Sequence, residues 1–498
     1  MMNGKDNKIN NERNNETSNK MRNGFSNFRK KYFGTKQFYR MTLGIAVPIM
    51  IQNGITNFVS LLDNIMVGQI GTEQMSGIAI VNQLLLVFNL AIFGAVSGAG
   101  IFTAQFYGKQ DHEGVRHTFR FKLYIATLIT LGSILILTVF GENLIAMYLQ
   151  GEDKGLSVEE ALRCGKRYLW IMYFGLLPFA IEQAYVGTLR ECGETVVPMI
   201  AGVVAVLVNL GLNYILIFGK FGCPVLGVAG AAIATVVSRY VEAAIVIIWT
   251  HCHTERMPFI MRAFSSWRVP TALCGQIIRR GTPLMVNEVL WAAGIAMINQ
   301  CYSMSSFEAV AVGNIASTIS NIFSICFIAF GDAIAIVVGQ YLGAGKFQEA
   351  RDTDTKLITF CVTLCIPLGI ILYLAAPLFP QLYKTTDEVR RLAAEYLRVS
   401  AIFMPVWAFM HASYFTLRSG GKTIITFLFD SVYLWVIAYP VAYILSRYTG
   451  ISLIPMYACV QSIDLVKCVI GFVLVKKGVW INNIVSVGQE KQDPLLKT

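Results

Sequence analysis

The hydrophobic residues of the chain gather in twelve stretches, each close to the length of about 20 residues that a helix needs to cross a bilayer. A polar segment at 251–281 separates the first six stretches from the last six. The stretches are 42–65, 75–102, 121–141, 168–188, 196–219, 225–250, 282–302, 312–340, 356–376, 396–417, 424–446 and 452–476. This pattern predicts an all-α integral membrane protein with twelve transmembrane helices.

An internal repeat relates the two sets of six stretches. At an offset of 235 residues, Pro48 matches Pro283 and Gln105 matches Gln340, and TLRECGET at 188–195 recurs as TLRSGGKT at 416–423. Because each half holds six stretches, both halves have the same orientation in the membrane, as in duplicated secondary transporters. We therefore predict two pseudo-symmetric six-helix bundles. The expected parts are a disordered basic tail at 1–40, an N-lobe at 41–250, an inter-lobe cytosolic loop at 251–281, a C-lobe at 282–476 and a cytosolic tail at 477–498.

The first stretch carries a polar stripe for which a lipid-facing helix has no use. On a helical wheel the stripe spans roughly 140° of arc, and it consists of Gln52, Asn53, Thr56, Asn57, Ser60, Asp63 and Asn64. A carboxylate deep in a membrane helix costs about 2.5–3.5 kcal/mol on insertion scales, so it normally faces water or a partner. Asp63 is either a packing residue bonded to neighbouring helices or an ion or proton site, and we favour the second. Four neighbours are then expected to line the substrate cavity, namely Gln52, Asn53, Thr56 and Asn57.

Two amides in the fifth stretch are candidates to join Asp63. Asn209 and Asn213 are four residues apart and therefore share one face of a helix. Amide oxygens beside a carboxylate suit a hard cation such as Na⁺, and the same group would serve a carboxyl that takes and releases a proton. Hydrogen bonding between packed helices is the alternative.

Further candidates lie in the second half. Asn287, Glu288, Trp291 and Tyr302 share one face of the seventh stretch, where an acid near an indole would attract a flat cationic compound. Asp430 opens the eleventh stretch and is either a cavity residue or a helix-end charge. A structural ion pair is the alternative for Glu288. In the twelfth stretch, Asp464 and Lys467 are spaced to neutralise each other.

Charge and composition set the topology and exclude other classes. The chain has 498 residues, is 55% hydrophobic and 14% charged, and has a net charge of +11. Ten of its 41 Lys and Arg residues precede Met41, and basic residues flank many of the stretches, which places both termini in the cytoplasm of a multi-pass cell-membrane protein. We expect no nucleic-acid partner. Nucleotide-binding, hydrolase and metal-ligand motifs are missing from the sequence, so we expect no enzyme, no metal and no cofactor, and energy from an ion gradient.

These residues resemble the multidrug and toxic compound extrusion (MATE) family, of the bacterial NorM and DinF type. The segments that carry the resemblance are LDNIMVGQIG (62–71), FGAVSGAGIFTAQFYGK (93–109), NLGLNYILIFGKFGCPVLGVAGAAIATVVSR (209–239) and NEVLWAAGIAMINQCYS (287–303). The resemblance implies two six-helix lobes and an N-lobe ion site at Asp63, Asn209, Asn213 and Thr235. It also implies a role for Glu288. Trp407 stands about where one branch of the family has an acid in the tenth helix.

The function expected from this reading is secondary active antiport. The protein would export amphipathic, mostly cationic organic compounds and drugs in exchange for Na⁺ or H⁺, by alternating access and as a monomer in the bilayer. The alternative is a flippase for a lipid-linked or oligosaccharide precursor, which would need several Arg or Lys residues in its cavity to hold pyrophosphate. The intramembrane charges without an obvious partner are acidic, namely Asp63, Glu288, Asp332 and Asp430, and this weighs against a flippase. A channel or a membrane enzyme is a third class.

Overall fold

A computed structural model describes residues 29–149, 158–306 and 308–486, without the side chains of 59–61, 64, 65, 72, 148 and 149. The ends of both predicted tails, 1–28 and 487–498, lie outside the described residues, as do the side chains of Ser60 and Asn64 in the polar stripe. The described part is helical and has no strand. Eleven of its helices are long and apolar enough to cross a membrane, and α2 (Lys36–Gly68) is a further helix of 33 residues. The predicted all-α membrane fold is confirmed.

The helices follow the twelve apolar stretches in order. After α2, the first half contains α3 (Thr72–Gly108), α4 (His112–Leu149), α5 (Val158–Glu191), α6 (Val196–Phe218) and α7 (Val228–Cys252). The second half contains α8 (Thr271–Ser303), α9 (Ala309–Gly343), α10 (Phe347–Ala375), α11 (Asp387–Ser419) and α14 (Leu453–Lys477). The eleventh stretch is divided into α12 (Thr423–Phe427), two π-helical turns, η3 (Leu428–Val432) and η4 (Leu434–Ala438), and α13 (Tyr439–Tyr448).

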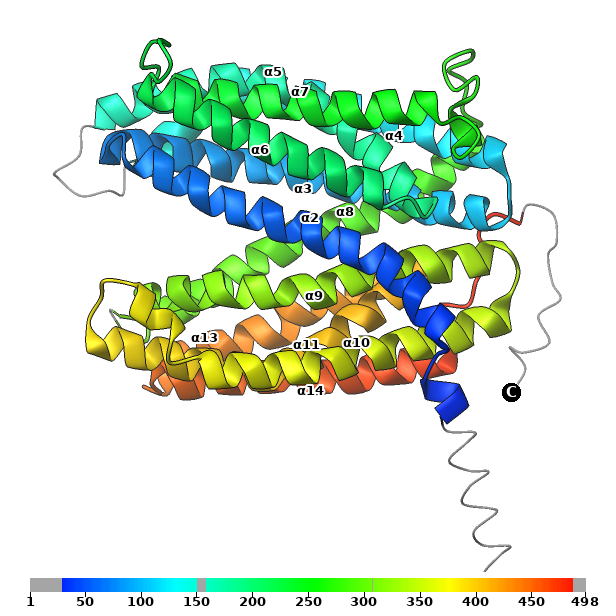
Figure 1. Cartoon of the computed structure of the whole chain (residues 1–498). Helices are drawn as coiled ribbons and strands as arrows, with labels where there is room; N and C mark the ends of the chain where they lie inside the picture. Colours follow the sequence, from blue (N-terminus) through cyan, green and yellow to red (C-terminus); the bar gives the residue numbers. More distant parts are fainter. Residues whose placement is uncertain (1–28, 150–157, 307, 487–498) are drawn as a thin grey trace, which may run out of the picture.

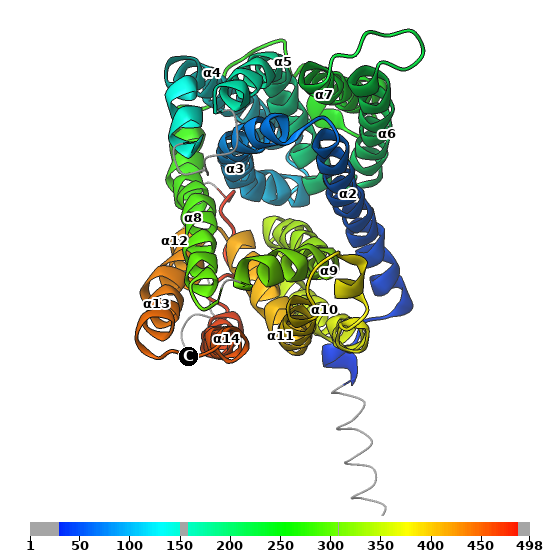
Figure 2. The ribbon, with the colours of Figure 1, turned by 90° about the vertical axis from the view of Figure 1, so that its left-hand side faces the viewer.

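Two bundles lie side by side, and the first helix of each half bridges them. Helices α3 to α7 form one bundle and α9 to α14 the other, while α2 and α8 flank the space between them (Figures 1 and 2). Helix α2 packs against both α6 and α9, and α8 packs against α3 as well as α12 and α13. Both described chain ends lie at the same end of the molecule (Figure 1), which we call the inner end. Helix α8 begins at Thr271, so residues 271–281 of the predicted inter-lobe loop are helical.

Repeat-related side chains join the two bundles at the inner end. The amide of Gln105 on α3 donates to the Ser419 carbonyl at 3.1 Å, and that of Gln340 on α9 donates to the Glu191 carbonyl at 2.8 Å. Ser419 and Glu191 occupy matching places in the two T-L-R segments, so one contact is the pseudo-symmetric copy of the other. Beside them, a Cβ at Gly108 would come within 1.9 Å of the Gln340 carbonyl oxygen. The helices approach this closely only because glycine has no side chain.

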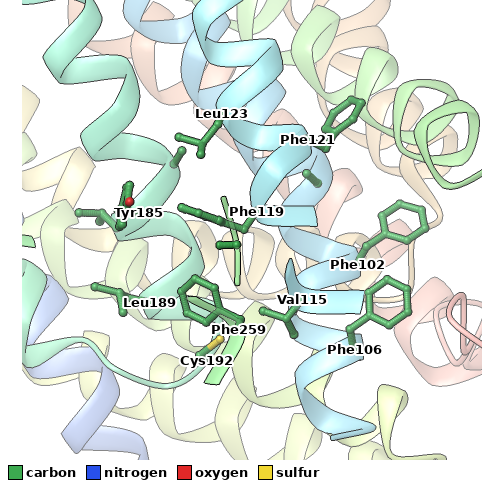
Figure 3. Close-up of a cluster of buried hydrophobic side chains, with 14 of the residues drawn as sticks. Phe102, Phe106, Val115, Phe119, Phe121, Leu123, Tyr185, Leu189, Cys192 and Phe259 are labelled. Carbon is green, nitrogen blue, oxygen red and sulfur yellow. The ribbon is translucent and has the colours of Figure 1, made fainter. Parts of the chain in front are cut away.

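A large aromatic cluster fills the inner end of the first bundle. Phe102 and Phe106 on α3, Phe119 on α4, and Tyr185 and Leu189 on α5 belong to it (Figure 3). Phe119 meets the Tyr185 ring edge to face at a centroid distance of 4.8 Å, an arrangement that aromatic pairs favour. This cluster makes the inner end of the N-lobe a rigid unit.

Candidate functional site

The structure brings Asp63 together with both amides of the fifth stretch. Asp63 lies on α2, and Asn209 and Asn213 lie one turn apart on α6, against which α2 packs. The Asn213 amide nitrogen donates to Asp63 Oδ1 at 2.6 Å and to Asn209 Oδ1 at 3.1 Å. Both asparagines are buried, whereas Asp63 is half-buried. A hydrogen bond to a carboxylate is stronger than a neutral one, so this contact fixes α2 against α6.

Asn209 connects this group to the next helix. Its amide nitrogen donates to Thr235 Oγ1 on α7 at 3.4 Å. With the amide turned by 180°, the same nitrogen donates to Asp63 Oδ1 at 2.9 Å instead. Oxygen and nitrogen of an amide are nearly equal in shape and are assigned from their partners. Asn209 can therefore serve the carboxylate either with its donor or with its oxygen, depending on what else is bound there.

One oxygen of this group has no donor. Asn213 Oδ1 is buried and accepts no hydrogen bond from the part of the chain that the structure describes. A buried acceptor without a partner costs free energy. Together with the Asp63 carboxylate it offers the oxygen ligands that a hard cation prefers. The four predicted ion-site residues thus lie together and have a donor set that fits a small cation.

Sequence reasoning missed a tyrosine near this group. Tyr168 on α5 is buried in the same apolar cluster as Val67 of α2 and Ile217 of α6, and its hydroxyl donates to Asn82 Oδ1 at 3.4 Å. A buried tyrosine hydroxyl normally needs a partner. Nothing in the spacing of the fourth stretch sets Tyr168 apart from its other aromatic residues, so the sequence held no signal for it.

The rest of the α2 stripe lies farther along the helix and is less enclosed. Gln52 accepts a hydrogen bond from Arg190, the arginine of the first T-L-R segment. Asn53 is half-buried, while Thr56 and Asn57 are exposed. The Thr56 hydroxyl donates to the Gln52 carbonyl one turn earlier at 2.9 Å. The stripe therefore contacts the inner end of the N-lobe at Gln52, and the cavity role of these four residues stays a prediction.

The predicted residues of the second half surround a cavity inside the C-lobe. The cavity has about 1700 Å³ of empty space, part of it open to the surroundings, and Glu288, Trp291, Tyr302 and Asp430 line it. Aromatic rings from four helices complete the wall, and they include Phe327, Tyr396, Trp407, Tyr414, Tyr433 and Tyr457. Trp407, which stands where relatives of one branch have an acid, donates its indole N–H to Gln461 Oε1 at 3.1 Å. Apolar walls with few polar groups are typical of small-molecule sites.

Asn287 holds the polar side of this cavity together. It is buried, and its amide nitrogen donates to Asp430 Oδ2 at 3.1 Å and to the Tyr414 hydroxyl at 3.3 Å. Its amide oxygen accepts from the Ser431 hydroxyl at 2.7 Å. The Tyr414 hydroxyl in turn donates to Glu288 Oε1 at 3.4 Å. Asn287 is thus a residue behind the cavity that orients the two acids lining it.

The prediction that Asp430 has no partner is wrong. Lys467 Nζ on α14 lies 2.7 Å from Asp430 Oδ1, so Lys467 pairs with Asp430 and not with Asp464 as the spacing suggested. The π-helical turn η3 carries Asp430, and the pairing depends on how that turn packs against α14. Intrahelical spacing identifies possible partners, but it does not rank them against partners on another helix. Wide π turns of this kind often occur at functional sites.

A second cavity between the two bundles was not predicted. It has about 760 Å³ of empty space near the inner end and is lined by Arg190 and Arg418, the arginines of the two T-L-R segments, together with Glu191 and Asp332. Lys122 forms an ion pair with Glu191 inside the N-lobe. The repeated arginine was the available signal, because a charged residue kept in both halves at a helix end has the same neighbours in each.

Comparisons with known proteins agree with this architecture. The MatE family model matches the chain twice, at residues 48–215 and 283–444. A Probable multidrug resistance protein NorM of Thermotoga maritima is 28% identical over 422 residues, covering 82% of this chain and 86% of the relative. A protein of the same name from Halalkalibacterium halodurans is 25% identical, covering 83% and 88%.

Solved structures share the fold. A crystal structure of MATE in complex with MaL6 has a TM-score of 0.77 at 19% identity and covers 90% of this chain and 99% of its own. An outward-facing multidrug resistance MATE family transporter of the MOP superfamily has a TM-score of 0.78 at 19% identity, covering 90% and 98%. Because the family model covers well over half of the chain and finds both halves of the repeat, this multi-pass membrane protein belongs to the MatE family, whose members are transporters and not enzymes.

Proposed function

We propose that this chain exports amphipathic, mostly cationic organic compounds in exchange for Na⁺ or H⁺, with both termini in the cytoplasm. The observation that carries the proposal is the cluster of Asp63, Asn209 and Asn213, in which Asn213 Oδ1 is buried without a donor from the described residues. The names of the relatives, Probable multidrug resistance protein NorM, support a drug-like cargo.

The two sites lie in different lobes, and this arrangement favours exchange. The ion site is formed by α2, α6 and α7, whereas the aromatic cavity lies within the C-lobe. Helix α2 packs against α6 of the N-lobe and α9 of the C-lobe, so a cation at Asp63 changes the charge at a contact that both lobes share. Ion and cargo would then drive the lobes in opposite directions, because each binds one state of the transporter better than the other.

Lining of the C-lobe cavity fits a flat cation with apolar surface. Glu288 and Asp464 supply negative charge, and Asp430 is neutralised by Lys467. The aromatic rings offer π faces on which an organic cation stacks. Arg418 also reaches this cavity, so compounds with an acidic substituent next to the cationic centre are expected to bind as well.

A flippase for a lipid-linked precursor is the second candidate, and one observation favours it. Arg190 and Arg418 lie together in the cavity between the bundles, and Lys467 lies in the C-lobe cavity, so the membrane interior does hold basic residues. Asp332 and Glu191 line the same inter-lobe cavity and balance the two arginines. A pyrophosphate site needs excess positive charge, which leaves the exporter as the better reading.

The test uses purified protein in liposomes with an imposed Na⁺ or H⁺ gradient and a fluorescent organic cation. We expect counterflow that saturates with cation concentration under at least one gradient, and its loss in Asp63→Asn, since an amide cannot exchange charge for an ion. Asp387→Asn, at an exposed acid with 98% of its side chain accessible, is the matched control and should transport normally. Equal transport by Asp63→Asn and the native protein under both gradients would reject the ion site.

A further inference from the structure

The chain continues beyond its last transmembrane helix into a segment that crosses the inner end. Helix α14 ends at Lys477, and Gly478 adopts a left-handed conformation with φ of 68° that turns the chain aside. Residues 479–486 then run between the two bundles (Figure 1, red). Trp480, Ile484 and Val485 in this segment are all buried, with Trp480 fully enclosed. Burial of three apolar residues after the last membrane helix is unexpected for a loose tail.

The segment is held by both lobes. Trp480 packs in the C-lobe cluster that contains Leu417 of α11, and Asn482 Nδ2 donates to the Gly420 carbonyl at 3.3 Å. Ile484 and Val485 instead belong to the aromatic cluster of the N-lobe shown in Figure 3. Residues 480 to 485 thus place one apolar anchor in each half of the protein.

Gln105 connects this segment to the contact that closes the inner end. Its amide nitrogen donates both to Ser419 of the C-lobe and to the Asn482 carbonyl at 3.1 Å, and its amide oxygen accepts from the Ile484 N–H at 2.8 Å. Lys109 Nζ adds a contact to the Val485 carbonyl at 3.5 Å. The repeat partner Gln340 makes only the equivalent contact between the lobes, with Glu191, so the segment gives Gln105 an additional role.

We infer that residues 479–486 are a latch of the inner gate, which must leave the N-lobe each time that gate opens. Opening separates Gln105 from Ser419 and Gln340 from Glu191, and a segment anchored on both sides of that separation must release one anchor. The N-lobe end releases, because Trp480 follows directly from α14 and its carbonyl packs against Gly420, where a Cβ would come within 1.7 Å. This inference rests on the proposed transport cycle.

Two chemical tethers test which end must move, in a protein with the exposed Cys252 and Cys459 replaced by serine. Lys109→Cys with Ser486→Cys, joined by a short disulfide-cleavable linker, ties the segment to the N-lobe. Lys422→Cys with Asn483→Cys, two residues that line one pocket, ties it to the C-lobe as the matched control. We expect the N-lobe tether to stop transport until the linker is reduced, and the C-lobe tether to leave the rate of the unlinked pair. Transport by the N-lobe-tethered protein, or an equal block by both tethers, overturns the inference.

A second measurement needs no transport and so separates failure of the latch from failure of the proposed function. Spin labels at the exposed Glu113 of α4 and Glu349 of α10 report the distance between the lobes at the inner end. Ile484→Asp places a charge in the N-lobe cluster and should add a population with a longer distance, whereas Ser486→Asp, at an exposed position, should not. An unchanged distribution in Ile484→Asp rejects the latch, even where no cation is transported.

Discussion

At the scale of single residues, the pair of Asp430 and Lys467 is the most sensitive contact of the C-lobe. Replacing Lys467 by Met leaves Asp430 facing the cavity with only the amide of Asn287 as a donor. Removing one partner of a buried ion pair costs about 3–5 kcal/mol, while replacing both with groups of similar shape costs much less. We therefore expect a large fall in the thermal unfolding temperature of Lys467→Met and its recovery in Asp430→Asn combined with Lys467→Met.

An exposed ion pair provides the control for this prediction. Arg390 and Asp387 lie 2.9 Å apart at the start of α11, where both side chains are exposed. Exposed pairs contribute about 0–1 kcal/mol, so Arg390→Met should barely change the unfolding temperature. If Lys467→Met were as mild as Arg390→Met, or if the double variant were the least stable of the set, the pair would have no net structural role.

Individual residues of the two candidate sites were predictable to different degrees. Asn209 and Asn213 share a face because helix periodicity fixes it, and the polar stripe of α2 had to meet polar partners, so their meeting with Asp63 follows from the sequence. The partner of Lys467 did not follow, because Asp464 on its own helix and Asp430 on another were both possible. Packing between helices decides such choices, and local spacing carries no information about it.

At the scale of helices, the crossing of α3 and α9 depends on two repeat-related glycines. A Cβ at Gly108 would lie 1.9 Å from the Gln340 carbonyl oxygen, and one at Gly343 would lie 1.9 Å from that of Gln105. Because backbone cannot yield as a flexible side chain does, Gly108→Ala should force the helices apart. We expect a lower unfolding temperature and a longer distance between labels at Glu113 and Glu349.

Gly132 in α4 is the matched control for this prediction. It lies inside a helix and has no atom within 4 Å of an added Cβ. Alanine is favoured over glycine in a helix interior by about 1 kcal/mol, so Gly132→Ala should be neutral or stabilising and leave the distance unchanged. A Gly108→Ala protein that matched Gly132→Ala in both measurements would mean that the crossing is loose.

Helix positions followed from the apolar stretches, but helix ends did not. The seventh stretch predicts a helix from 282, whereas α8 begins at Thr271. Membrane hydropathy marks only the part of a helix that meets lipid, and the preceding turns carry Arg279 and Arg280 outside that signal. The π turns around Asp430 were equally hidden, because no residue type marks a π turn as glycine marks a left-handed one.

At the scale of the whole molecule, the duplication was readable from the sequence, while the joint between its halves was not. Offsets that pair Gln105 with Gln340 and the two T-L-R segments with each other require similar lobes. They do not reveal that each glutamine reaches the T-L-R segment of the opposite lobe. The latch lies outside the repeat altogether, since residues 479–486 follow the last helix and have no counterpart at the end of the first half.

The latch breaks the symmetry of the inner gate, and this asymmetry can be measured. Gln105 makes three hydrogen bonds, two of them to the latch, whereas Gln340 makes one. At about 0.5–1.5 kcal/mol for each hydrogen bond, Gln105→Leu should destabilise the closed inner end by about 1–3 kcal/mol more than Gln340→Leu. With a factor of ten for each 1.4 kcal/mol, labels at Glu113 and Glu349 should report a clearly larger open population in Gln105→Leu. Equal populations in the two variants would mean that the repeat alone sets the gate, and that residues 479–486 contribute nothing to keeping it closed.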